Sequence, residues 1–414
     1  MSGGGNVPYH LRQNKAIDRN LFVELLSRIN LVKDIEAYTY ISFGGSFLED
    51  FKLIHSITGI SKMISLEVDE NIRNRQKFNM PLNCIEPRHL TSGEFLENHT
   101  FEGENIVWFD YASPKEIEQQ LDETQYLITQ LHDFDIVKIT LNANANSLAD
   151  HQTLEITKAK RSLKSKEESL KNCENSLKES AMSLKEAKNR NEDLMTAAAE
   201  EEKVKSSNFE AETEQNQHRL KKANQIVAPV RQSGLVVLPN ELNDLRLEKL
   251  KERTGKHFLE EIETTDMKQV HYPNALCKVL KIAIQKAMDS KPKSYFQPLT
   301  AFSYADSSHT MLTYTGIILP SDDKKIKDFF DGTRLKAWDL FQPDGDRSIE
   351  ISIPALSLKE RMTIDSLLPL TDATRIQASL GFFVEGFDET SSIKSLSQYI
   401  KYYRQYPQFL KVSI

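Results

Sequence analysis

The stretch Tyr38-Thr-Tyr-Ile-Ser-Phe-Gly-Gly-Ser-Phe-Leu-Glu-Asp-Phe51 decides the fold of this chain. It starts as an apolar and aromatic run, breaks at Gly44-Gly45, and resumes with helix formers. This order predicts a strand, a tight turn and a helix. Glycine suits a backbone that turns sharply or lies close to a ligand, and the amides at a helix start favour negative groups. The stretch therefore predicts a ligand-binding turn.

A second strand, Met63-Ile-Ser-Leu-Glu-Val-Asp69, follows and ends in carboxylates. A glycine turn followed by an acidic strand end is how nucleotide-binding α/β folds hold an adenosine, with the carboxylate on the ribose hydroxyls. Glu67 is in the right position for this role. Further apolar strands are expected at 104–111 and 134–141, with helices between them. Such alternation predicts a parallel sheet with crossover helices.

The composition changes after residue 146, where Lys, Glu, Ala, Ser, Asn and Leu dominate. Leucine recurs every seven residues at Leu163, Leu170, Leu177 and Leu184, which is typical of a coiled-coil seam. A helical hairpin inserted into the sheet is one interpretation. A single long helix that pairs with another chain is the second, and a solvated helical insertion without a partner is the third.

Two β-rich runs, 296–304 and 310–319, follow the insertion and predict a hairpin. A methyltransferase sheet ends in such an antiparallel pair, whereas a dinucleotide-binding oxidoreductase would continue with a parallel strand. Beyond residue 320 the pattern is mixed, with strands expected at 349–353 and 377–384.

Length and charge limit the function classes. A chain of 414 residues is too long for one ordinary core, and a net charge of −7 gives no general attraction for nucleic acid or anionic membrane. Nucleic acid could bind only through a local patch. The three cysteines and the histidines show no metal-ligand spacing. No apolar run is long enough to span a bilayer. We expect a cytoplasmic protein with no metal and no membrane contact.

The chain resembles the class I S-adenosylmethionine-dependent methyltransferases, and most closely the bacterial family of "putative O-methyltransferases" often encoded beside mobile-element or phage-defence genes. The motifs that carry the resemblance are Leu11-Arg-Gln-Asn-Lys-Ala-Ile-Asp-Arg19, Phe43-Gly-Gly-Ser-Phe-Leu-Glu-Asp-Phe51, Ile64-Ser-Leu-Glu67, Arg75, Phe78-Asn-Met-Pro81, Ile106-Val-Trp-Phe-Asp-Tyr111, Asn142-Ala143 and Phe302-Ser-Tyr-Ala-Asp306. It implies a Rossmann-like α/β sheet with a terminal antiparallel β-hairpin, interrupted by the coiled-coil insertion. The implied domains are 1–146 and 231–320 for the two parts of the methyltransferase, 147–230 for the insertion, and 321–414 for an α+β extension.

The same resemblance implies S-adenosylmethionine as the cofactor and assigns roles to site residues. The cofactor-binding set is Phe43, Gly44, Gly45, Ser46, Glu67, Ser92, Gly93 and Glu94. Asp110 is the expected base or acceptor-orienting carboxylate, and Tyr111 is expected to shape the acceptor pocket. Arg12, Lys15, Arg19 and Asn142 form the expected substrate-binding or lid set, in which the basic side chains could bind a carboxylate or phosphate.

Two function hypotheses follow. The first is an S-adenosylmethionine-dependent O-methyltransferase whose coiled-coil arm recruits a protein partner or substrate, as a hetero- or homo-oligomer, in a bacterial anti-phage defence system. The second is a catalytically degenerate scaffold or cofactor sensor that acts through its coiled coil. The turn Ser42-Phe-Gly-Gly-Ser-Phe47 lacks the first acidic residue and third glycine of the family pattern, which favours the second hypothesis. Glu67 and the glycine pair favour the first.

Overall fold

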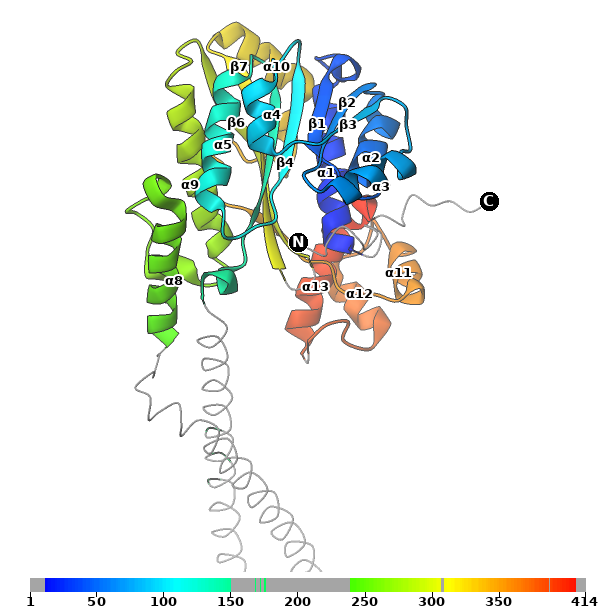
Figure 1. The fold of residues 1–414 in the computed structure, drawn as a ribbon. Helices are drawn as coiled ribbons and strands as arrows, with labels where there is room; N and C mark the ends of the chain where they lie inside the picture. The colour runs from blue at the N-terminus through cyan, green and yellow to red at the C-terminus, as the bar shows by residue number, and fades with distance from the viewer. Residues whose placement is uncertain are drawn as a thin grey trace, which may run out of the picture. The chain divides into compact units, whose positions relative to one another are not determined.

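A computed structural model describes residues 12–149, 239–306, 309–386 and 388–406, together with Glu168, Asn172 and Asn175 (Figure 1). The chain divides into two compact units, residues 1–145 with 250–414, and residues 146–249. The leucine seam expected at 163–184 lies outside the described residues. The first unit contains all of the predicted site residues.

One mixed sheet of eight strands forms the centre of this unit, with the order β3-β2-β1-β4-β5-β7-β6-β8. The strands are β1 (Thr39–Phe43), β2 (Lys62–Leu66), β3 (Ile85–Arg88), β4 (Asn105–Asp110), β5 (Ile136–Asn142), β6 (Ser294–Asp306), β7 (His309–Pro320) and β8 (Ile349–Ile351). The first five pair in parallel, and β7 runs antiparallel to both β5 and β6. The antiparallel β7 excludes the sixth parallel strand that a dinucleotide-binding oxidoreductase would need.

Helices cover both faces of the sheet (Figure 1). One face carries α1 (Gln13–Ile29), α2 (Glu49–Thr58) and α3 (Glu70–Asn79), and the other carries α4 (Ser92–Asn98), α5 (Ile117–Gln130) and α9 (Tyr272–Met288). The remaining helices are α8 (Pro239–Thr254), α10 (Asp323–Thr333), α11 (Leu358–Asp365), α12 (Ala373–Leu380) and α13 (Glu389–Tyr402).

The period of two along β4 explains why helices are needed on both faces. Trp108 packs edge to face with Phe22 of α1, at 5.3 Å between ring centroids, whereas Phe109 stacks on Phe43 on the other face. Successive side chains of a strand point to opposite faces, so a strand that is apolar throughout must be buried on both sides. The residues of β4 are accordingly almost fully buried.

Two expectations for the last third of the chain are corrected. The antiparallel pair β6–β7 is not terminal in the sheet, because β8 adds in parallel along the outer edge of β6. The segment 377–384 is not a strand, because α12 extends through Leu380 and ends at Gly381, whose φ is 73°. Asp372 caps this helix by accepting the amide of Arg375, at 2.9 Å.

Candidate functional site

The candidate site lies at the carboxyl ends of β1 and β4. These strands are neighbours, yet the chain runs outward from them in opposite directions, through β2 and β3 on one side and β5 on the other. Open α/β sheets bind their ligands in the crevice at such a switch point. The glycine turn follows β1 here, and Asp110 ends β4.

The two glycines of the turn face different surroundings. A Cβ on Gly44 would lie 2.0 Å from Ser65 Oγ and 2.8 Å from Gln76 Nε2, so Gly44 is required by close packing within the protein. The Gln76 amide donates to the carbonyl oxygen of Gly44 from α3, and this fully buried residue was not predicted. A Cβ on Gly45 would meet nothing within 4 Å. The open side of the turn is therefore at Gly45.

Glu67 lies at the carboxyl end of β2, beside this turn. Its backbone amide bonds to the carbonyl of Arg88, at 3.1 Å, which fixes the end of β2 against β3. Its side-chain Oε1 accepts the amide of Asp69, at 2.9 Å. Burial raises the pKa of Glu67 above its ordinary value, and the amides of Asp69 and Val68 oppose this only in part. Its carboxylate retains acceptor capacity for ligand hydroxyl groups.

The segment 91–94 opens α4 and is bonded within the protein. Thr91 and Glu94 form a capping box, in which Glu94 accepts the amide of Thr91 at 2.8 Å. Ser92 donates to Glu123 of α5 at 2.6 Å, and the Tyr111 hydroxyl donates to the same oxygen at 2.6 Å. Glu123, another residue that the sequence did not reveal, therefore ties the segment beside Gly93 to the residue after β4.

Three aromatic rings line the same edge of the sheet. Phe43 stacks on Phe109 with ring centroids 5.1 Å apart and packs edge to face with Tyr111 at 5.4 Å. Tyr111 is buried, and its hydroxyl is engaged by Glu123. Tyr111 thus contacts both Phe43, which precedes the glycine turn, and Glu123. It forms part of the wall of the site.

Asp110 lies among cationic side chains from α1. Its Oδ2 accepts from Arg19 at 3.0 Å and lies 3.8 Å from the Lys15 ammonium. Burial would raise the pKa of Asp110, but Lys15, Arg19 and a hydrogen bond from Thr140 outweigh burial and hold the pKa below its ordinary value. A carboxylate that stays ionised is a weak proton acceptor, so its surroundings favour an orienting role over that of a base.

Behind Asp110 lies a set of charged residues that we call the buried ion cluster, namely Asp18, Arg19, Asp50 and Lys138. Arg19, with 1% of its surface exposed, donates to Asp50 at 3.2 Å and to Asp18 at 3.2 Å. Asp18 also accepts from Lys138, at 2.9 Å. The cluster balances two cations against two anions and joins α1, α2 and β5 beneath the site.

The other two members of the predicted lid set have different positions. Asn142, at the end of β5, donates to the carbonyl of Ala112 at 3.2 Å and accepts the amide of Asn144, so it holds the segment after Tyr111. Arg12 precedes α1 and does not cap it through its side chain. The structure thus brings Lys15, Arg19 and Asp110 together. Asn142 lies behind the segment that follows Tyr111.

Comparisons with known proteins give the family. A family model described as "Putative O-methyltransferase" matches residues 7–227 and 213–414. The chain belongs to this O-methyltransferase family. The match to this family points to S-adenosylmethionine as the cofactor. No curated protein matches the chain.

Solved structures similar to this O-methyltransferase family member share little sequence with it. One is a "putative S-adenosylmethionine dependent methyltransferase" of Listeria monocytogenes, at 13% identity and a TM-score of 0.23, over 30% of this chain and 56% of that one. Another is an S-adenosylmethionine dependent methyltransferase of Mesorhizobium loti, at 13% identity and a TM-score of 0.23, over 31% and 56%. The chain thus spans about half the length of either. The family assignment rests on the family model.

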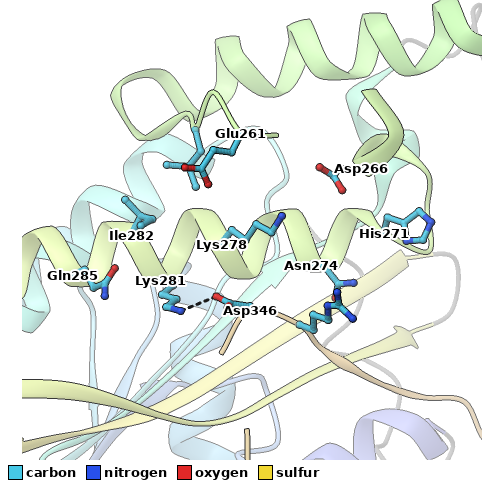
Figure 2. A pocket seen from close by; sticks show the side chains of 11 residues that line it. Glu261, Asp266, His271, Asn274, Lys278, Lys281, Ile282, Gln285 and Asp346 are labelled. Carbon is cyan, nitrogen blue, oxygen red and sulfur yellow. Dashed lines mark hydrogen bonds and ion pairs between the residues drawn. The ribbon is translucent and has the colours of Figure 1, made fainter. Parts of the chain in front are cut away.

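This O-methyltransferase family member also has a groove along α9, with a volume of about 790 Å³ (Figure 2). Both acidic and basic side chains line it, among them Lys281 and Asp346, whose charged atoms are 2.7 Å apart. The lining includes none of the residues at the carboxyl ends of β1, β2 and β4. The groove is therefore separate from the candidate site.

Two absences hold for the described part of the chain. No group of three His, Cys, Asp or Glu residues there could hold a metal ion. No helix there is long and apolar enough to cross a membrane.

Proposed function

We propose that this protein is an S-adenosylmethionine-dependent methyltransferase that holds its cofactor at the carboxyl ends of β1 and β2. The observation that carries the proposal is the open space at Gly45 next to the half-buried Glu67, at the switch point of the sheet. A close backbone approach and a carboxylate for the ribose hydroxyls are what an adenosine ligand needs there.

For methyl transfer, the protein mainly has to position two reactants. A bound S-adenosylmethionine would supply an electrophilic methyl group for an in-line displacement. Glu67 would accept the ribose hydroxyls, and the Gly45 backbone would lie against the methionine part. Asp110, held ionised by Lys15 and Arg19, would orient the acceptor. Correct positioning is itself worth several orders of magnitude in rate.

The roles of Ser92 and Glu94 in this proposal are indirect. Both side chains bond within the protein, to Glu123 and Thr91 respectively. Their contribution would be to fix the backbone at Gly93, whose Cβ position would lie 3.5 Å from Glu123. The adenine would then contact the backbone of this segment.

The insertion at 147–230 remains a proposed site for a protein partner, in a homo- or hetero-oligomer. The scaffold or sensor alternative differs from the enzyme in one measurable respect, because a scaffold need not bind the cofactor.

Calorimetric titration with S-adenosylmethionine and S-adenosylhomocysteine tests the proposal. We expect micromolar binding by the native chain and at least a tenfold loss in Glu67→Gln, about 1.4 kcal/mol, because the amide keeps the shape but loses the charge. Since burial raises the pKa of Glu67, affinity should fall as the pH is lowered and Glu67 becomes protonated, and this fall should begin at a higher pH than for an ordinary glutamate.

A matched control is Glu86→Gln, which changes an exposed carboxylate that pairs with Arg88 on β3, at 2.8 Å. It should bind as the native chain does. Equal binding by Glu67→Gln and the native protein would contradict the placement of the ribose, and no binding by the native chain at millimolar ligand would contradict the enzyme itself.

A further inference from the structure

Arg19 contacts both sides of the candidate site at once. Its Nε donates to Asp50, in the first turn of the helix that follows the glycine turn, at 3.2 Å. Its Nη2 donates to Asp110, on the acceptor side, at 3.0 Å. The two carboxylates belong to segments 60 residues apart in sequence, and both bond the same planar guanidinium.

The remaining contacts hold the guanidinium in place. Nη1 donates to Asp18 at 3.2 Å and to the Tyr304 hydroxyl at 2.9 Å, and the group lies 4.6 Å from the centre of the Trp108 ring. Asp18 is held in turn by Lys138 and by the Thr313 hydroxyl, at 2.7 Å. The planar guanidinium, with directional hydrogen bonds on every side, is held in a single orientation. A lysine ammonium could not make the same set of hydrogen bonds.

We propose that Arg19 is a positioning residue that fixes the cofactor side and the acceptor side of the site in one frame, through Asp50 and Asp110. This rests on the proposed function. Movement of α2 changes the backbone around Gly45, and movement of Asp110 changes the acceptor position. Because Arg19 bonds both, neither side moves without the other, and the geometry needed for an in-line transfer is kept.

The direct test compares Arg19→Lys with Arg28→Lys on the same helix. Arg28 is the control because it too pairs with a carboxylate, that of Glu24 at 2.9 Å, and lies over a tryptophan, Trp338 at 5.0 Å, but contacts neither side of the site. We expect the dissociation constant for S-adenosylmethionine to rise at least tenfold in Arg19→Lys and less than twofold in Arg28→Lys. In a Trp338→Phe background, the emission of Trp108 should shift in Arg19→Lys.

A double-mutant cycle covers the case in which Arg19→Lys does not fold. Asp50→Asn and Asp110→Asn each keep an oxygen acceptor and remove one charge from Arg19. Because the frame needs both bonds, either substitution alone breaks it, so the loss of affinity in the double variant should be at least threefold smaller than the product of the single losses. Asp50→Asn combined with Glu86→Gln should be additive.

The outcomes separate the two proposals. If the native chain binds S-adenosylmethionine but Arg19→Lys folds and binds within twofold of it, the positioning role is wrong and the proposed function stands. Additivity within 1.5-fold in the Asp50 and Asp110 cycle, about 0.2 kcal/mol, would overturn the positioning role in the same way. If the native chain does not bind, the proposed function is wrong and this inference falls with it.

Discussion

Asp18→Asn is expected to lower the free energy of unfolding of the first unit by about 3–5 kcal/mol, the usual cost of leaving a buried charge uncompensated. Asp18 has no exposed surface, and its carboxylate accepts from Arg19, Lys138 and Thr313. An asparagine has the same shape but no charge, and its amide group would face two cations. The balanced cluster would then hold an excess of positive charge in the protein interior.

Thermal and urea unfolding followed by Trp fluorescence would measure this loss. Glu24→Gln is the control, because Glu24 lies on the same helix and pairs with Arg28 at the surface, with 30% of each side chain exposed. Exposed pairs of this kind contribute about 0.3–0.5 kcal/mol. If Asp18→Asn lowers the free energy of unfolding by less than 1 kcal/mol, the cluster is not an ionised group shielded from water.

Gly44→Ala and Gly45→Ala are expected to affect different properties of the protein. Gly44→Ala should destabilise the fold by about 3 kcal/mol, because overpacking displaces buried neighbours. The added methyl would meet Ser65, Gln76 and Leu48, whose Cδ2 would be 2.7 Å away. Gly45→Ala should leave stability within about 0.5 kcal/mol, since its Cβ meets no protein atom.

Gly45→Ala should weaken ligand binding although it leaves stability unchanged. The methyl group of Gly45→Ala would occupy the space proposed for the cofactor, so S-adenosylmethionine should bind at least tenfold more weakly to a protein of native stability. Ser65→Ala should restore part of the stability of Gly44→Ala, because it removes the nearest clashing atom. Native affinity in Gly45→Ala would show that the ligand does not approach this face of the turn.

Local patterns predicted the elements that position the site. The apolar runs and the glycine pair predicted β1, its turn and the start of α2, and the acidic end of β2 predicted a ligand-binding role for Glu67. These features depend on neighbouring residues in the sequence, which a single chain displays. The segment 377–384 was misread because a short apolar run does not distinguish a strand from a helix. The structure shows an N-cap at Asp372, a residue type that favours a helix start.

The partners of the site residues could not be predicted in the same way. Gln76 and Glu123 act through contacts with Gly44, Ser92 and Tyr111, and polar residues on helices are ordinarily read as solvated. Arg19 was expected on a basic lid, yet its carboxylate partners come from three different elements. Such convergence depends on the tertiary fold, and a single sequence carries no record of it.

The strand predicted at 349–353 is present as β8, over Ile349–Ile351, but its place in the sheet could not be predicted. It pairs with Phe302, Ser303 and Tyr304 of β6, which lie far from it in the sequence. Which segment forms the edge strand of a sheet depends on how the whole chain packs.

Photochemical cross-linking of methyl-tritiated S-adenosylmethionine to the native chain, followed by peptide mapping, tests the placement of the cofactor most directly. We predict saturable labelling, competed by S-adenosylhomocysteine, in peptides that contain Phe43–Phe47 or Asp110–Tyr111, because their aromatic rings lie at the proposed site. Label confined to the α9 groove, or label that unlabelled ligand does not displace, would contradict a cofactor site at the carboxyl ends of β1 and β2.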